Sequence, residues 1–267
     1  MPEFKTFKII GKSYRENPVK RKKFRETYVE PAIKKFLENG FEPDDENPDL
    51  VVTIGGDGSL FSAFKKYPDT TFFGLRAESK GASFDYGYED VDKAIEKLMK
   101  KEYKILKLPE AKLEYKGKEA LGLNEVYFIR DTSKFPGADR FRIYKNGEDI
   151  YGDEIYADGC ALVTPFGSAA YNRSYYGPIL KHNEGMIVTP MAGCYLHETE
   201  VVNGIEVALN AKPKILNDDD EITVEIKRNA QNVIYSDNKI MSLENLKTGD
   251  KINFRKSKKF SKMIKFK

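Results

Sequence analysis

One carboxylate stands inside a run of glycines, directly after an apolar segment. The run is Gly55, Gly56, Asp57, Gly58 and Ser59. Glycine permits positive φ angles and lets a ligand approach bare backbone, and N–H groups at a helix start favour an anion. A carboxylate there is useful if it accepts a proton, binds a metal ion or hydrogen-bonds a hydroxyl group. The pattern therefore predicts a phosphate-binding turn with a reactive carboxylate, or a plain strand-to-helix turn with a locally bonded aspartate.

Two adjacent polar residues further along the chain have side chains that could bind a sugar. Asn124 and Glu125 are adjacent and lie between apolar neighbours at the head of an expected strand. An amide and a carboxylate together can grip the two hydroxyl groups of a ribose. Read alone, the pair is equally consistent with two turn residues.

A third stretch gathers hydroxyl groups and a ring at an expected strand-to-helix junction. After Asp158, a strand ends at Thr164, the chain turns through Gly167, and a helix is expected to open at Ser168. The small residues before Tyr171 leave room for a flat ligand ring. The alternative is a serine-capped helix with a core tyrosine.

Together these three stretches resemble the NAD kinase family. The order and separation of the motifs, the chain length and the α/β-then-β layout agree as well, and the resemblance is close over residues 50–180. The matching residues are Gly55-Gly56-Asp57-Gly58-Ser59, Asn124-Glu125, Asp158-Gly159, Thr164-Pro165, Gly167-Ser168, Ala170-Tyr171 and Ser174.

The resemblance implies a reaction. A member of this family transfers the terminal phosphoryl group of ATP, or of inorganic polyphosphate, to the adenosine-ribose 2′-hydroxyl of NAD, giving NADP. The transfer uses Mg²⁺ or another divalent metal. Family members are homodimers or homotetramers, in which the β-rich half of one subunit completes the site of another.

The resemblance also implies residue roles, carried over by position. Asp57 would be the catalytic carboxylate and is the sole candidate for a protein contact to the metal. The phosphates would be lined by Gly55, Gly56, Gly58 and Ser59. The dinucleotide would be held by Asn124, Glu125, Thr164, Ala170, Tyr171 and Ser174, with Asp158 at the nicotinamide riboside end.

One segment departs from the family pattern. Most members follow the third strand with Asn-x-Gly-x-Leu-Gly-Phe-Leu, but residues 76–85 lack the Leu-Gly-Phe core, and Gly81 and Phe84 are the nearest counterparts. A changed acceptor is therefore compatible with the sequence. The alternatives are a lipid or other small-alcohol kinase with the same glycine turn, and a non-catalytic dinucleotide-binding module. Retention of Asp57 argues against the module.

The secondary structure expected to position these residues changes along the chain, from alternating strands and helices to strands alone. Strand patterns at residues 4–11, 48–54 and 70–75 alternate with helical patterns at residues 19–39, 59–66 and 91–101. Asn17 and Pro18 favour a helix start, and Pro31 should kink or split the first helix. This order predicts an α/β domain over residues 1–101 with an open, parallel, Rossmann-like sheet.

The rest of the chain reads as β structure. Period-two alternation and turn pairs such as Asn146-Gly147 predict antiparallel hairpins. We therefore expect a β-rich, sandwich-like domain over residues 102–250 for dinucleotide binding and oligomerisation. A basic tail over residues 251–267 is expected to pack back on the body.

Bulk composition limits the partners and the compartment. The 45 basic and 42 acidic residues give a net charge of +3, too balanced to argue for a nucleic-acid partner. We find neither a signal peptide nor an apolar run long enough for a membrane span. Cys160 and Cys194 have no metal spacing, which favours a reducing, cytoplasmic setting.

Overall fold

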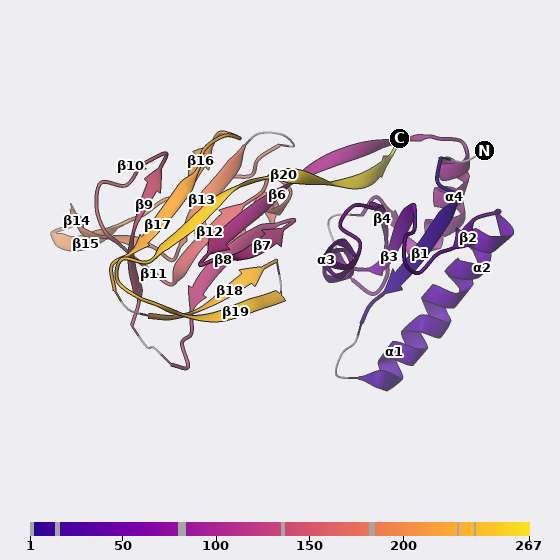
Figure 1. Cartoon of the computed structure of the whole chain (residues 1–267), viewed down its shortest axis with the longest axis horizontal. Coiled ribbons are helices and arrows are strands. Elements are labelled where there is room, and N and C mark those ends of the chain that lie inside the picture. The colour runs from indigo at the N-terminus through magenta and orange to yellow at the C-terminus, as the bar shows by residue number, and fades with distance from the viewer. Residues whose placement is uncertain are drawn as a thin grey trace. The chain divides into compact units, whose positions relative to one another are not determined.

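The computed structural model describes residues 3–13, 17–79, 84–134, 137–181, 185–228, 230–237 and 239–267. The chain divides into two compact units (Figure 1). The first comprises Met1–Lys107 and Ser261–Lys267, and the second comprises Leu108–Phe260. We describe each unit by itself.

The unit boundaries fall inside two long strands, β6 (Tyr103–Tyr115) and β20 (Lys251–Phe266). The sequence predicts a boundary at residue 101, but the first unit extends to Lys107. The first residues of β6 still pack on the first unit, where the Tyr103 hydroxyl donates to Glu3 Oε2 at 2.6 Å. The basic tail is likewise divided, because only its last seven residues belong to the first unit.

The first unit is built on a parallel sheet. The strand order is β2-β1-β3-β4, the end of β20 pairs in parallel with β4, and β5 adds to the same strand. Every residue of β3 is buried, as expected for a parallel strand covered on both faces. The strands are β1 (Thr6–Gly11), β2 (Glu42–Pro43), β3 (Leu50–Gly55), β4 (Thr71–Arg76) and β5 (Tyr86–Gly87).

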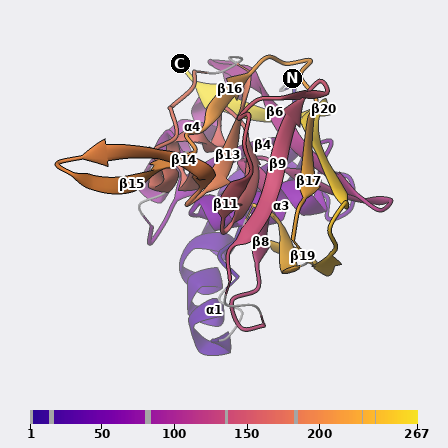
Figure 2. The same ribbon diagram turned by 90° about the vertical axis from the view of Figure 1, so that its left-hand side faces the viewer.

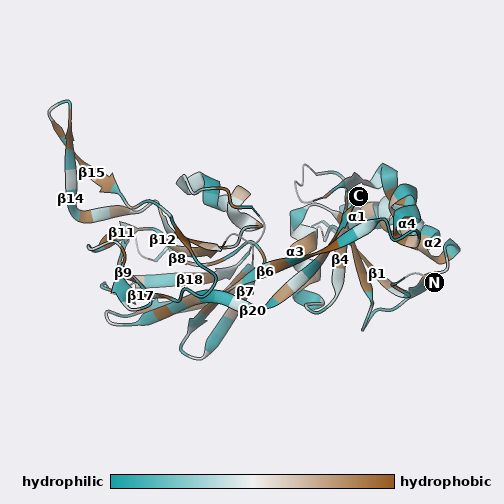
Figure 3. Cartoon of the chain, turned by 90° about the horizontal axis from the view of Figure 1, so that it is seen from above, coloured by the Kyte–Doolittle hydropathy of each residue, from teal (hydrophilic) through white to brown (hydrophobic). Residues whose placement is uncertain are grey.

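Helices cover this sheet. In Figure 3 strand β1 is coloured mainly as hydrophobic, whereas the neighbouring helices carry many hydrophilic residues. The helical segments are α1 (Pro18–Phe24), η1 (Arg25–Val29), α2 (Glu30–Glu38), α3 (Asp57–Lys66), η2 (Tyr88–Asp90) and α4 (Val91–Met99). None of the helices in the described part of the chain has the length and apolar content needed to span a bilayer.

The first helix starts where the sequence predicts, and it continues through its internal proline. The Asn17 side chain accepts the N–H of Lys20 at 2.9 Å, as expected of an N-cap. Pro31 does not break the helix, and α1 and α2 form one rod (Figure 1). A π-helical turn, η1, precedes the proline instead. Its wider spacing accommodates the missing N–H and the ring of Pro31.

The second unit contains two antiparallel sheets. One has the order β15-β14-β11-β9-β17-β20, with β10 on β9 and the β6-β7 pair beside β20, and the other has the order β16-β13-β12-β8-β18-β19. The remaining strands are β7 (Lys118–Gly122), β8 (Glu125–Arg130), β9 (Asp139–Lys145), β10 (Glu148–Asp149), β11 (Ile155–Ala157), β12 (Gly159–Val163), β13 (Met186–Met191), β14 (Cys194–Val202), β15 (Ile205–Asn210), β16 (Lys214–Leu216), β17 (Ile222–Ile226), β18 (Ala230–Ser236) and β19 (Lys239–Leu246).

The predicted hairpin at Asn146-Gly147 is confirmed. These residues have φ angles of +51° and +91°, the left-handed values that a two-residue turn between antiparallel strands requires. A second hairpin, β14 and β15, reaches well outside the rest of its unit (Figure 2).

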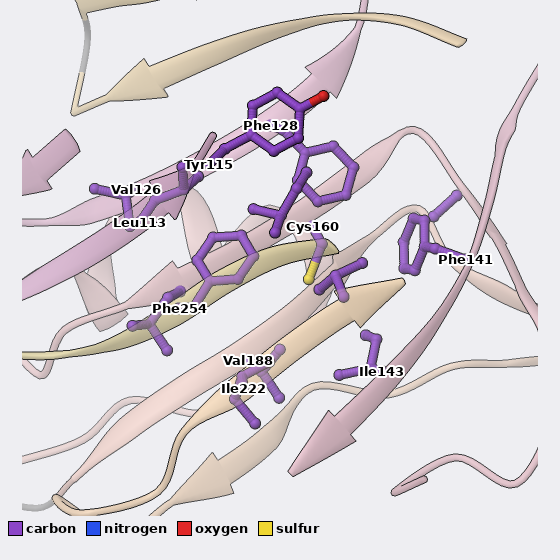
Figure 4. Close-up of a cluster of buried hydrophobic side chains, with 14 of the residues drawn as sticks. Leu113, Tyr115, Val126, Phe128, Phe141, Ile143, Cys160, Val188, Ile222 and Phe254 are labelled. Atoms are coloured by element: carbon purple, nitrogen blue, oxygen red, sulfur yellow. The ribbon is translucent and has the colours of Figure 1, made fainter. Parts of the chain in front are cut away.

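The two sheets of the second unit enclose an aromatic and aliphatic core (Figure 4). Phe128 of β8 meets Phe141 of β9 edge-on, with ring centroids 5.6 Å apart. Phe254 of β20 lies 6.3 Å from the same ring. Contacts between residues of both sheets make this unit a β-sandwich, so the predicted fold class is confirmed.

Removing the central ring should destabilise the sandwich. Phe128 is fully buried, so Phe128→Ala leaves a cavity and should lower the free energy of unfolding by about 3–5 kcal/mol, measured by denaturant titration. Leu243→Ala, at a side chain that is 64% exposed, is the control and should change it by about 0.5 kcal/mol or less. Equal effects of the two substitutions would contradict this view of the core.

Candidate active site

The residues selected from the sequence fall into two sets, one in each unit. The glycine turn from Gly55 to Ser59 lies in the first unit, and the set from Asn124 to Ser174 lies in the second. Gly81, from the segment that departs from the family pattern, lies outside the described residues.

The glycine turn connects the buried strand β3 to helix α3. Gly55 ends the strand with φ +143°, and Gly56 is the extended N-cap residue. The sequence predicts a helix start at Ser59, but α3 begins at Asp57. The reason is a first turn closed by the N–H of Ser59, which donates to the carbonyl of Gly56 at 2.9 Å. Asp57 therefore stands in the first helical turn, where a negative charge is favoured.

A side chain at either of the two leading glycines would displace a serine hydroxyl group. A Cβ on Gly55 would lie 2.6 Å from the Ser59 Oγ, and one on Gly56 would lie 2.7 Å from the Ser79 Oγ. The Ser79 hydroxyl donates to the Gly55 carbonyl at 2.9 Å. Ser59 is 7% exposed, so its hydroxyl packs beneath the turn, whereas Gly58 is exposed.

Asp57 has one carboxylate oxygen that the protein does not satisfy. Asp57 is half-buried, and its Oδ1 is shielded from solvent without a hydrogen-bond partner. A buried acceptor without a donor is costly, which indicates that a ligand group meets it.

The sequence analysis did not select Lys12, which lies at the same sheet edge as this turn. Lys12 directly follows β1, which pairs in parallel with β3, and its Nζ donates to the carbonyl of Glu78 at 3.4 Å. Ligands of open α/β sheets bind outside the carboxyl ends of parallel strands. A lysine directly after a predicted parallel strand was the available signal.

In the second unit, a hydrogen-bond network ties the start of β8 to the end of β12. The N–H of Thr164 donates to the Asn124 carbonyl at 2.8 Å, and the Thr164 hydroxyl donates to the Leu123 carbonyl at 2.6 Å. That hydroxyl also accepts the N–H of Gly167 at 3.0 Å. Thr164 is fully buried, so its side chain holds the turn together.

Glu125 and Asp237 form a buried carboxyl pair beside that network. Asp237 Oδ1 accepts the N–H of Asn124 at 2.7 Å, and the N–H of Asp237 donates to the Glu125 carbonyl at 2.9 Å. Glu125 Oε2 is buried without a hydrogen-bond partner. Burial, and then the charge of Asp237, raises the pKa of Glu125 to about 8, so this carboxyl is mostly protonated at neutral pH.

Asp237 was not among the site residues predicted from the sequence. Its neighbour Asn238 lies outside the described residues. No local pattern reveals that an aspartate more than a hundred residues away holds the backbone of Asn124.

Asp158 is held by an arginine that sequence reasoning also missed. The Arg130 Nε donates to Asp158 Oδ1 at 2.6 Å, and the Arg130 N–H donates to the Asp158 carbonyl at 2.8 Å. The Asp158 side chain is 37% exposed, so it remains accessible to a ligand.

The segment after Thr164 forms two short 3₁₀ turns, η3 (Gly167–Ala169) and η4 (Tyr171–Tyr175), where the sequence predicts a helix. Ser168 interrupts the helix because its buried hydroxyl donates to Pro165 and accepts the N–H of Leu180. As a result Ala170, Tyr171 and Ser174 are exposed. The Tyr171 hydroxyl accepts a hydrogen bond from the Tyr175 hydroxyl at 2.8 Å.

The described residues contain no cluster of three or more His, Cys, Asp or Glu side chains able to hold a metal ion. A metal would therefore take most of its ligands from water and from a bound phosphate chain, as Mg²⁺ commonly does. The unpartnered oxygen of Asp57 fits a single protein contact to such an ion or to its water.

Known proteins share this fold. No protein-family model matches the chain. The structure of yeast NADH kinase complexed with NADH matches with a TM-score of 0.75 and 18% identity, covering 100% of this chain and 84% of that one. The structure of an NAD kinase from Archaeoglobus fulgidus in complex with ATP matches with a TM-score of 0.71 and 18% identity, covering 98% and 94%. The fold is thus that of dinucleotide kinases.

Sequence identity to a known protein identifies the family of this chain. The NAD kinase of Leuconostoc mesenteroides is 30% identical over 218 residues, which cover 78% of this chain and 76% of that protein. This chain therefore belongs to the NAD kinase family and is an enzyme of the phosphotransferase class, as the resemblance predicted.

A side chain at Gly167 should disturb the second set. A Cβ there would lie 2.2 Å from the Asn124 carbonyl oxygen and 2.6 Å from its Cα, so the backbone must move. We expect Gly167→Ala to lower the free energy of unfolding by about 1–3 kcal/mol and to shift the amide NMR signals of Asn124 and Thr164. Ala169→Ser, at an exposed neighbouring position, should do neither. Unmoved amide signals in Gly167→Ala would refute the close packing.

Proposed function

We propose that this chain transfers a phosphoryl group to the 2′-hydroxyl of the adenosine ribose of NAD, producing NADP. Membership of the NAD kinase family supports the proposal. The single structural observation that carries it is the unpartnered, buried oxygen of Asp57 at the glycine turn.

Phosphoryl transfer to this hydroxyl requires mainly a general base and an aligned phosphate chain. A ribose hydroxyl is a poor nucleophile, and Asp57 accepts its proton as the oxygen bonds to the terminal phosphorus. The bond from that phosphorus to the bridging oxygen of the donor breaks, and ADP leaves. NAD and ATP thus become NADP, ADP and one proton.

The donor phosphates would lie along the glycine turn. Gly56 and Gly58 offer backbone N–H groups at the start of α3, Gly55 makes the preceding turn, and Lys12 brings positive charge to the same sheet edge. Ser59 supports the turn from beneath. ATP is the donor favoured by the ATP complex of the Archaeoglobus relative, and polyphosphate is the alternative.

The dinucleotide would be bound by the second set. Asn124 and a protonated Glu125 offer both donors and acceptors to ribose hydroxyls. Exposed Ala170, Tyr171 and Ser174 would contact the dinucleotide, and Asp158 would face the nicotinamide riboside end. Thr164 would act by holding this surface in shape.

Mg²⁺, when bound, would neutralise charge on the transferring phosphates. Asp57 is the residue that would contact the ion, directly or through a water.

We place the enzyme in the cytoplasm, as a homodimer or homotetramer. Both cysteines are free thiols, as a reducing compartment requires. Apolar side chains lie exposed on the paired strands β14 and β15 at a sheet edge, where Val201 is 73% and Ile205 is 65% exposed. Exposed apolar edges of this kind favour association between copies.

A coupled assay tests the activity. Purified protein with Mg²⁺, NAD and ATP should yield NADP, detected with an NADP-specific dehydrogenase, and polyphosphate replaces ATP in a parallel reaction. Failure with both donors, together with phosphorylation of another alcohol, would instead support a small-alcohol kinase. NAD binding without any turnover would support a non-catalytic module.

Asp57→Asn tests the base. The amide cannot take the hydroxyl proton, so kcat should fall by about 10²- to 10⁴-fold while NAD affinity, measured by calorimetry, is retained. The control is Asp69→Asn, which removes an exposed carboxylate of the same unit and should leave kcat unchanged. An Asp57→Asn enzyme with normal kcat would remove this residue from the chemistry.

A further inference from the structure

A buried aspartate and a buried asparagine join the two sheets of the second unit. Asp139 begins β9 and is 2% exposed, whereas Asn232 lies in β18 and is fully buried. The Asn232 Nδ2 donates to Asp139 Oδ2 at 2.5 Å. Because β9 and β18 belong to different sheets, this bond crosses the sandwich.

One further side-chain oxygen atom of each residue has no hydrogen-bond donor. Asp139 Oδ1 and Asn232 Oδ1 are both shielded from solvent, and neither has a hydrogen-bond partner. If Asp139 were ionised, both atoms would be acceptors with no donor between them. An unsatisfied buried acceptor destabilises the folded state, and more so when it carries charge.

A single proton satisfies both atoms. We propose that Asp139 retains its proton on folding and donates from Oδ1 to Asn232 Oδ1, so that the acid and the amide make two reciprocal hydrogen bonds. A carboxylic acid and a primary amide each present one donor and one acceptor on the same edge, so they match. The bond from Asn232 Nδ2 to Asp139 Oδ2 is one half of this arrangement.

The charges around the pair fit a retained proton. Burial raises the pKa of Asp139 to about 7, and Asp158 adds to the rise. The Asn232 hydrogen bond, Arg130 and Arg228 act in the opposite direction. The two arginines therefore do not overcome burial.

The pair also bears on Asp158, in a step that rests on the proposed function. Asn232 pairs with Arg130 across β18 and β8, and Asp139 pairs with Ala157, the residue before Asp158. An ionised Asp139 would compete with Asp158 for Arg130. A neutral Asp139 leaves Arg130 bonded to Asp158, so Asp139 is a positioning residue for the carboxylate at the dinucleotide surface.

Asp139→Asn is the matched variant, because an amide at this position makes the same two bonds and does not titrate. In wild type the folded pKa, about 7, lies above the ordinary 3.8, so the unfolded chain releases its proton first as the pH rises. Asp139 therefore costs stability progressively between about pH 4 and pH 7. We expect the melting temperature of Asp139→Asn minus that of wild type to grow across this window and to level off above it. Exposed Asp219→Asn, the control for charge, should show no such growth.

The proton itself can be observed without any enzyme activity. In protein with ¹³C-labelled aspartate carboxyl groups, the NMR signal that is absent from Asp139→Asn should titrate near pH 7 in folded wild type. A midpoint below pH 5 would overturn the acid–amide pair. An inactive wild-type enzyme would count against the proposed function alone, because this titration does not depend on turnover.

The positioning role has its own readout. The dissociation constant for NAD, measured by calorimetry, should rise in wild type as the pH passes 7 and should rise less in Asp139→Asn. Identical pH profiles for the two proteins would reject the positioning role of Asp139.

Discussion

At the end of β3 the backbone must turn within a space that has no room for a side chain. Gly55 takes a φ of +143°, and a Cβ on either leading glycine would collide with a serine hydroxyl. The helix consequently begins at Asp57, with bare N–H groups on one side of the carboxylate. The proposed chemistry depends on this turn, because the start of a helix favours an anion and one oxygen of Asp57 has no hydrogen-bond partner.

Burial decides the state of the carboxyl groups in the second unit. Desolvation is the largest influence on both Glu125 and Asp139, and it raises their pKa values to about 8 and about 7. Asp158 is instead partly exposed and bonded to Arg130. Burial therefore favours the neutral form of Glu125 and Asp139, whereas Asp158 is held by an ion pair at the surface of the same β-sandwich.

Local patterns predicted much of the fold. The continuous apolar run before Gly55 gave a buried parallel strand, and Asn146-Gly147 gave a hairpin, because both depend on residues adjacent in sequence. The helix at Ser168 was wrong because a hydroxyl bonded to Leu180 competes with the helical backbone. The boundary at residue 101 followed a change in composition, whereas the packing of β6 changes only after Lys107.

The amino-acid sequence by itself determined the family, the order of the elements and the glycine turn that carries Asp57, because the motifs and the periodic patterns behind them are each local in sequence. Only the tertiary structure decided which groups face one another. Three hydrogen bonds join segments that are distant in sequence. They link Asp237 to the backbone of Asn124, Arg130 to Asp158 and Asn232 to Asp139. Strand pairing brings these residues into contact, and desolvation favours the protonated form of the buried carboxyl groups. Both effects arise only when the two sheets pack together.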